Sequence, residues 1–209
     1  MNKANLILIG AGGHAHSCID VIEQHGQYRI AGLVGRPAEM NTQHLGYDVI
    51  AIDDDLPVLA KTYRYALITV GHIRSADNRI RLYRRALELG FQLPCLVAPT
   101  AHVSRHATIG AGTIVMHGAI VNAGARIGDN CIINTLALVE HDAAVEDHSH
   151  ISTGAILNGG ATVGTESFVG SGSIVKEGIS IGKGCLIGMG LAVRHNLADQ
   201  THFVGKERS

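Results

Sequence analysis

The sequence contains no tryptophan, and aromatic residues make up only 4% of its 209 positions. A domain that fills its core with large side chains would use more of them, whereas the 26 glycines favour a thin and repetitive architecture. An excess of charge of one sign is also lacking, because the 17 lysines and arginines are balanced by 18 acidic residues. Nothing therefore steers the protein toward nucleic acid or an anionic membrane, and we expect a small-molecule partner.

Long apolar runs and paired cysteines are absent from the sequence too. The longest apolar run, near Leu6 to Ile9, is far too short to span a bilayer, and the amino terminus does not have the layout of a signal peptide. The four cysteines are scattered and form no CxxC pair, which argues against a zinc knuckle or a disulfide framework. We expect a cytoplasmic protein whose cysteines are small buried residues.

What the sequence does contain is an aliphatic residue at every sixth position from Val103 to Val193, sixteen in succession. The fourth position after each aliphatic up to Ile187 is small, with Ile179 and Leu191 as exceptions. A period of six fits neither a helix nor a lone strand, but it suits a triangular coil in which each side uses one repeat. This pattern predicts a parallel β-helix with eighteen residues per turn. We expect glycines near its corners to supply backbone freedom, for example Gly110, Gly128, Gly164 and Gly182.

Residues 1–98 have a different sequence pattern, in which strand-like segments alternate with helix-like ones. Strands are expected at 6–9, 30–34 and 66–70, and a helix at about 76–89. Such alternation predicts a small parallel α/β sheet of the Rossmann-like kind. The sequence thus divides into an α/β N-terminal domain, residues 1–98, and a β-helix domain, residues 99–209.

A glycine motif follows the first predicted strand. Gly10, Gly12 and Ala15 fit the pattern G-x-G-x-x-A, which would place a phosphate group at the amino terminus of the next helix. Dinucleotide binding also requires an acidic residue after the second strand, where this chain has Gly35 and Arg36. NAD chemistry is therefore disfavoured. A nucleotide or diphosphate-sugar site and a simple tight turn both remain open.

One histidine among the repeats lies between two carboxylates, in the segment Glu140-His141-Asp142. A neighbouring carboxylate orients an imidazole and raises its basicity, as a general base in acetyl transfer requires. The alternative is that His141 only decorates a solvated surface. Spacing alone does not choose between it and the other histidines in and beside the repeats: His102, His106, His117, His148, His150, His195 and His202.

Several motifs together resemble a known family. They are the GAGGHA opening, the segment I-N-T-x-x-x-[LIV]-E-H-[DE] at 133–142, and Ile151-Ser152-Thr153-Gly154. The chain is similar in these to bacterial sugar acyltransferases that include sialic acid O-acetyltransferases and bacillosamine-type nucleotide-sugar N-acetyltransferases. The aliphatic-Gly-x-x-small-x repeat looks like the hexapeptide acyltransferases, which implies a left-handed β-helix and a homotrimer. The resemblance implies acetyl-CoA as co-substrate, no metal, His141 as general base and Asp142 as the residue that strengthens it.

The resemblance also implies where acetyl-CoA binds. His150 matches the family histidine that contacts the co-substrate, and the pantetheine arm lies in a groove between neighbouring subunits. Residues one coil apart would line that groove, which predicts roles for Gly159, one coil from His141, and for the column Thr153, Ser171 and Met189. Asn134 is a plausible polar contact nearby, and hydrogen bonding within the stack is its alternative.

For the acceptor, the resemblance assigns the sugar nucleotide to Gly12, Gly13 and His14. Gly35 and Arg36 depart from the family pattern of acidic residues at that point, which leaves the nucleotide open. The leading hypothesis is N-acetylation of a nucleotide-linked 4-amino-dideoxy sugar in bacterial surface glycan synthesis. O-acetylation of sialic acid or a related nonulosonic acid is the close alternative.

Two other classes of function compete with acetyl transfer. A γ-type carbonic anhydrase uses the same β-helix, but its ligands include two histidines five residues apart, a pair that the repeats lack. A non-catalytic scaffold is the remaining alternative, and loss of all CoA binding would support it.

Overall fold

The computed structural model describes residues 3–205, and its N-terminal part contains a sheet of five strands. All neighbours in the sheet are parallel except β3 and β4. The strand order is β3-β4-β2-β1-β5, so the chain reverses direction across the sheet at β1. The strands are β1 (Ala4–Ile9), β2 (Tyr28–Gly35), β3 (Gln43–His44), β4 (Tyr47–Ile52) and β5 (Tyr65–Ile68).

Helices cover both faces of this sheet. Leu6 and Leu8 of β1 pack toward α1, whereas Ile7 and Ile9 pack with Leu82 of α3. Because neither face meets water, β1 is apolar at successive positions, as expected of a central parallel strand. The helices are α1 (Gly13–His25), α2 (Leu56–Leu59) and α3 (Asp77–Glu88), with 3-10 turns at Pro37–Glu39 and Asp53–Asp55.

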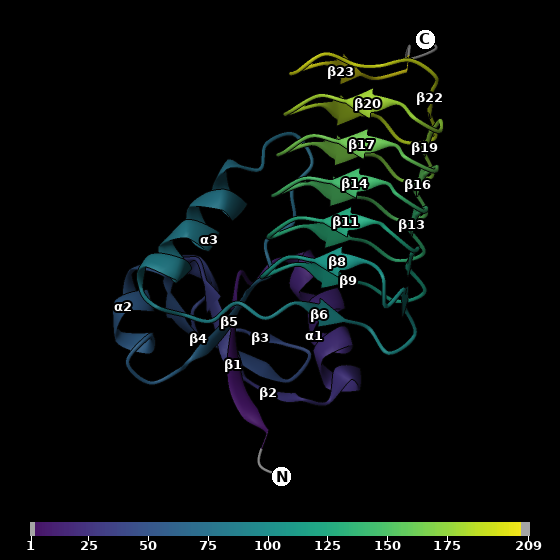
Figure 1. The fold of residues 1–209 in the computed structure, drawn as a ribbon. Coiled ribbons are helices and arrows are strands. Elements are labelled where there is room, and N and C mark those ends of the chain that lie inside the picture. The colour runs from purple at the N-terminus through teal and green to yellow at the C-terminus, as the bar shows by residue number, and fades with distance from the viewer. Residues whose placement is uncertain (1–2, 206–209) are drawn as a thin grey trace.

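The rest of the chain winds into a left-handed parallel β-helix, a triangular prism with three parallel sheets (Figure 1). The first face contains β7 (His102–Val103), β10 (Ile120–Val121), β13 (Leu138–Val139), β16 (Ile156–Leu157), β19 (Ile174–Val175) and β22 (Ala192–Val193). The second contains β8 (Thr108–Ile109), β11 (Arg126–Ile127), β14 (Ala144–Val145), β17 (Thr162–Val163) and β20 (Ser180–Ile181). The third contains β6 (Leu96–Val97), β9 (Ile114–Val115), β12 (Ile132–Ile133), β15 (His150–Ile151), β18 (Phe168–Val169), β21 (Leu186–Ile187) and β23 (His202–Phe203).

The predicted eighteen-residue coil is confirmed by the strand register. Val121 pairs with Val139, and Val139 pairs with Leu157, so each aliphatic lies directly on the one a coil before it. These aliphatics and the small residues at the corners form one buried cluster along the prism axis. The last coil is shorter, since Leu197 pairs with Ile181, sixteen residues away.

The corners differ from the expectation in one respect. Left-handed backbone conformations recur every six residues, but not at the four glycines predicted to supply them; the positions are Gly112, Gly118, Gly124, Asn130, Leu136, Asp142, His148, Gly154, Gly160, Glu166, Gly172, Gly178, Gly184 and Gly190. Gly164 is required for a different reason. A Cβ at Gly164 would lie 2.7 Å from the backbone carbon of Gly182 in the next coil, so lack of space excludes a side chain there.

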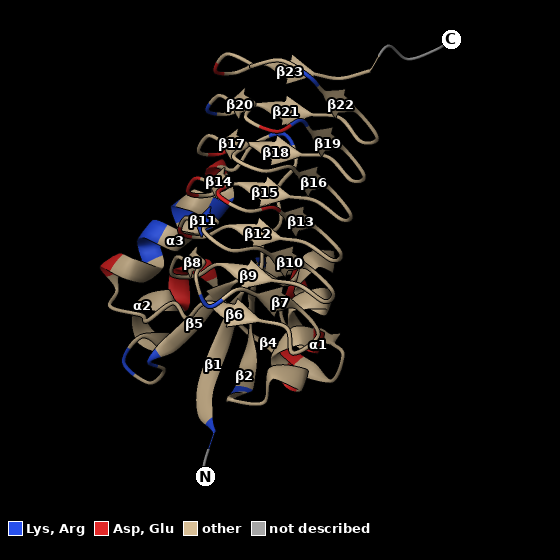
Figure 2. Ribbon diagram, turned by 45° about the vertical axis from the view of Figure 1, so that its right-hand side comes forward, with Lys and Arg blue, Asp and Glu red and all other residues tan. Residues whose placement is uncertain are grey.

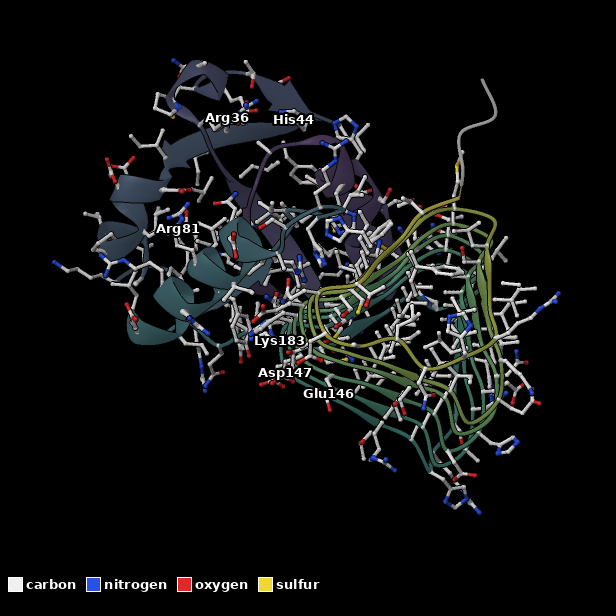
Figure 3. All side chains as sticks on the ribbon, turned by 90° about the horizontal axis from the view of Figure 1, so that it is seen from above. Arg36, His44, Arg81, Glu146, Asp147 and Lys183 are labelled. Atoms are coloured by element: carbon white, nitrogen blue, oxygen red, sulfur yellow. The ribbon has the colours of Figure 1, made fainter. Side chains whose placement is uncertain are left out.

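The α/β domain packs against the third face of the prism. Leu96, Ile114 and Ile132, which point outward from this face, belong to the same apolar cluster as α1. Seen along the prism axis, Glu146, Asp147 and Lys183 gather at the corner between the second and third faces, beside α3 (Figure 3). The outward side chains of the third face are therefore buried from Leu96 to Phe168, whereas His202 of its last strand is exposed. No helix among residues 3–205 is long and apolar enough to cross a membrane.

Candidate active site

His141 and Asp142 occupy the corner between β13 and β14, at the edge shared by the first and second faces. The Asp142 carboxylate accepts a hydrogen bond from His141 Nδ1 at 2.9 Å, and both side chains are about two-thirds exposed (67% and 72%). Asp142 has φ 61°, one of the left-handed corner positions, and its backbone N–H donates to the Ala123 carbonyl of the preceding coil. The corner geometry therefore holds the carboxylate beside the ring.

This pairing sets the chemistry of the imidazole. The hydrogen bond to Asp142 is the main cause that raises the pKa of His141 above its ordinary value, and the charges of Asp142 and Glu140 add to it. With Nδ1 donating to the carboxylate, Nε2 carries the lone pair. Nε2 faces the neighbouring coil at Gly159, where an added Cβ would lie only 2.6 Å from it. The arrangement can accept a proton from a nucleophile that enters beside Gly159.

An open groove surrounds this pair, lined by Glu140, His141, Asn158, Gly159, Glu177 and Gly178. The backbone carbonyl of His141 accepts from Gly160, one coil on. His141 and Gly159 thus stack at one corner, as the spacing predicts.

The column Thr153, Ser171 and Met189 also stacks coil upon coil, but at the corner between the third and first faces. Gly172 donates to the Thr153 carbonyl and Gly190 to that of Ser171. Met189 is 81% exposed. One chain therefore does not bring this column into the groove of His141, because the whole first face separates the two corners. A role for Ser171 and Met189 in binding acetyl-CoA stays a prediction.

A second cavity, of about 620 Å³, lies at the carboxyl end of the parallel strands and reaches the third face of the prism. Gly12, Gly13 and His14 line it together, at the start of α1. Gly10 makes the preceding turn with φ 122°, and a Cβ there would lie 2.6 Å from the Val70 side chain. The glycine motif thus lines this second cavity, called the glycine cavity below, at a helix amino terminus and at the point where the order of strands in the sheet reverses.

His150 lines this second cavity and not the groove of His141. Its Nδ1 donates to the His72 carbonyl at 2.9 Å, and its Nε2 lies 3.1 Å from Asn134 Nδ2. The amide of Asn134 is oriented by its oxygen, which accepts from the Thr135 backbone N–H. These contacts fix His150 as a neutral ring with both nitrogens engaged, and burial lowers its pKa to about 4. Contact of His150 and Asn134 with acetyl-CoA stays a prediction.

Sequence reasoning missed two residues of this cavity. His72 follows β5 with no recognisable motif, and its proximity to His14 depends on the pairing of β1 with β5 inside the α/β domain. Glu39 supplies a carboxylate beyond the second strand, three residues after Arg36. It is already paired, because it accepts from the Arg36 backbone and side chain at 2.8 and 2.6 Å.

The described part of the chain contains no cluster of three or more histidine, cysteine, aspartate or glutamate residues arranged to hold a metal ion.

Comparisons with known proteins agree with this geometry. The family model of the PglD N-terminal domain matches residues 5–85, and that of the hexapeptide repeat of succinyl-transferase matches residues 160–194. None of the curated proteins compared with the chain matches it.

Among solved structures, perosamine N-acetyltransferase from Caulobacter crescentus is 32% identical, with a TM-score of 0.90 over 98% of this chain and 95% of that chain. It is a histidine-to-asparagine variant in complex with CoA and GDP-perosamine. The acetyltransferase domain of PglB from Neisseria gonorrhoeae, in complex with acetyl coenzyme A, is 32% identical, with a TM-score of 0.87 over 95% of each chain. WeeI from Acinetobacter baumannii shares the fold at 19% identity and a TM-score of 0.79.

Proposed function

The chain belongs to the family of hexapeptide-repeat nucleotide-sugar N-acetyltransferases, and we propose that it transfers the acetyl group of acetyl-CoA to the amino group of a nucleotide-linked 4-amino-dideoxy sugar. The observation that carries the proposal is the exposed His141–Asp142 pair, whose free nitrogen faces an open groove. Support comes from relatives solved with CoA and GDP-perosamine or with acetyl coenzyme A. Use of the product in bacterial surface glycans and a cytoplasmic location belong to the same proposal.

In the proposed reaction, the sugar nitrogen attacks the thioester carbonyl carbon while His141 Nε2 takes a proton from that nitrogen. Collapse of the tetrahedral intermediate breaks the carbon–sulfur bond, and CoA leaves as a thiol with the proton returned from the ring. Asp142 keeps the ring in the tautomer that can accept the proton and stabilises the imidazolium that forms. The chemistry requires only these side chains and donors for the oxyanion.

The site as proposed needs a second copy of the chain. His141 lies at one edge of the first face and the Ser171–Met189 column at the other, while the glycine cavity lies against the third face. Threefold packing through the first face would bring the Met189 edge of one copy to the His141 edge of the next. The base of one subunit would then act at a groove completed by its neighbour.

The side chains of the first face support this packing. Its outward residues are aliphatic along four coils, and Ile120 and Ile174 are 40% and 43% exposed. The strands of this face carry no charged residues (Figure 2). By contrast, the second face presents Thr108, Arg126 and Ser180. An exposed aliphatic stripe of this kind marks an interface.

Light scattering on the variant with both Ile120→Glu and Ile174→Glu tests the homotrimer. We expect a trimer mass for the unaltered protein and a monomer mass for the variant, with loss of acetyl-CoA binding. Thr108→Glu, on the second face, is the matched control and should remain a trimer. A monomeric unaltered protein that still transfers acetyl groups would refute the shared groove.

The proposed function is tested by thiol release from acetyl-CoA with UDP- and GDP-linked 4-amino sugars, beside free and CMP-linked sialic acids. Turnover of an amino sugar that disappears in His141→Ala would establish N-acetylation. Turnover of the sialic acids alone would favour O-acetylation, and unaltered activity in the variant would remove His141 as the base. Absence of both turnover and CoA binding would favour a scaffold.

A further inference from the structure

The floor of the glycine cavity is rich in donors. Gly12 and Gly13 begin α1, a helix of 13 residues, and no side chain caps that end. Its first backbone N–H groups therefore face the cavity with the positive end of the helix dipole. A helix terminus alone does not define a site, and the side chains beneath it decide what the cavity binds.

Two histidines line this floor with unused nitrogens. His72 is only 7% exposed, and neither of its ring nitrogens makes a well-aligned hydrogen bond within residues 3–205, although the Ser167 backbone lies near enough to favour a charged ring. His14 Nε2 is likewise buried and without a hydrogen bond among those residues. Buried polar atoms are rarely left without partners, so these nitrogens point to a ligand that is acidic or accepts hydrogen bonds.

A buried cation, Arg79, lies near the imidazole rings of His14 and His72. Arg79 of α3 is 1% exposed and donates to three carbonyls, those of Ile68, Val70 and Asn130. Its Nη2 has no partner in the described chain, and no carboxylate of that part pairs with it. A buried guanidinium without a counter-ion is costly. A positive charge therefore lies behind the two rings, and an anionic ligand in the cavity would balance it.

Burial and the charges around the two rings set their protonation state in the free protein. Burial, followed by the charge of Arg79, lowers the pKa of His14 to about 3. Burial, followed by His150 and Arg79, lowers the pKa of His72 to about 3, although the Ser167 backbone favours its charged form. Both rings are therefore neutral near pH 7.

The other titratable groups nearby do not supply a counter-charge. His148 also faces His72, and Cys18 lies near Arg79. On the rim, Glu39 is held by Arg36 and Asp53 by Arg81. The negative charge that the floor lacks must come from the ligand.

The family resemblance already assigns the sugar nucleotide to Gly12, Gly13 and His14, and we propose that His14 and His72 take up one proton between them as its diphosphate binds in this cavity. The proposal rests on the proposed function for the identity of the ligand. Two negative charges placed against the rings favour an imidazolium, and the like charge of Arg79 limits the uptake to one proton for the pair.

The direction of the pH dependence follows from linkage. The diphosphate raises the pKa of a ring that is low in the free protein, so the bound state holds more protons than the free state. Binding is then tightest at low pH and weakens as pH rises toward the pKa of the bound state, by about tenfold per pH unit at most. A nucleotide held by neutral donors alone would show no such slope beyond the ionisation of its own phosphate.

Calorimetry on the full chain measures the proton directly. GDP, UDP and inorganic pyrophosphate are titrated at pH 6.5 in two buffers of different ionisation enthalpy, since the difference in heat gives the number of protons taken up. After correction for the phosphate of each ligand, we expect close to one proton per bound diphosphate. Equal heats in both buffers, or no binding of any of the three ligands, would overturn the proposal.

Variants locate the proton. The double variant His14→Gln and His72→Gln keeps polar donors but cannot be protonated, and we expect it to bind about tenfold more weakly at pH 6.5, with no uptake. His16→Gln, an exposed position on the same helix, is the matched control and should behave as the unaltered protein. Full uptake in the double variant would place the proton elsewhere.

Nucleotide binding is measured without acetyl transfer, so the two proposals fail separately. Proton uptake without thiol release would reject the proposed reaction only. Thiol release from an amino sugar, with binding heats independent of buffer, would reject the proton uptake only.

Discussion

The two regions of the molecule use histidine in opposite ways. At the prism corner, His141 is exposed and hydrogen-bonded to Asp142, which raises its pKa. In the glycine cavity, His14, His72 and His150 are enclosed between the domains, where burial lowers their pKa values. A carboxylate partner and access to solvent make an imidazole a stronger base. Burial keeps the other imidazoles neutral until a charged ligand raises their pKa.

The sharpest test of this contrast is His141→Ala. We expect kcat to fall by about 10²- to 10⁴-fold, because the reaction loses its general base. The thermal unfolding midpoint should not change, since the side chain is largely exposed. Thiol release and a melting curve measure the two quantities. His202→Ala removes an exposed imidazole from β23 and should leave both unaltered.

Gly159→Ala should have the next largest effect. A Cβ at this position would lie 2.6 Å from His141 Nε2, so the ring must move from its place beside Asp142. A displaced base costs on the order of 10²-fold in kcat. Gly188→Ala is a milder change in the same prism, with its nearest contact at 3.3 Å from the Leu191 side chain. Equal kcat values for the two variants would show that the ring does not depend on Gly159.

Asp142→Asn should lower activity by roughly tenfold and shift its pH dependence. The hydrogen bond to Asp142 raises the pKa of His141, and activity needs the deprotonated ring. The rising limb of kcat/KM against pH should therefore move to lower pH in the variant. Asparagine tolerates the left-handed backbone at φ 61°, so the corner should be retained. If the rising limb stays at the same pH in the variant, His141 is not the group whose ionisation controls activity.

Met189→Ala tests the predicted acetyl-CoA column and should have the smallest effect. If Met189 packs on the pantetheine arm, its loss should raise KM for acetyl-CoA by about fivefold and leave kcat unchanged. The side chain is 81% exposed in one chain, so stability should not change. Val58→Ala, at an exposed site on α2, is the control for both measurements. An unchanged KM would show that the corner of Met189 does not contact acetyl-CoA.

Most of the prism could be predicted from the sequence because each coil repeats the same local rule. The spacing of Val121, Val139 and Leu157 is enough to place these residues one above another. The predicted division after residue 98 falls one residue beyond β6, a strand that already pairs with β9. The shortened last coil was not predicted, because Leu197 lies only four residues after Val193 and so interrupts the period.

The catalytic corner was predictable for the same local reason, since Glu140, His141 and Asp142 are neighbours in sequence. The glycine cavity was predictable only in part. The setting of His72, Arg79 and His150 depends on how the α/β domain sits on the third face, a contact between segments up to 78 residues apart. No local pattern records that contact. The physical role of Gly164 was also hidden, because it depends on the approach of another coil.

Because the strand register of the prism is strict, the number of its coils can change without altering its catalytic residues. A duplication of residues 164–181 would add one complete coil beyond the corner of His141, and each new strand would meet the same partners as before. Neither the His141–Asp142 pair nor the glycine cavity would change. Selection can therefore adjust the reach of the groove in steps of about 4.8 Å, one coil at a time, while the reaction chemistry is inherited intact.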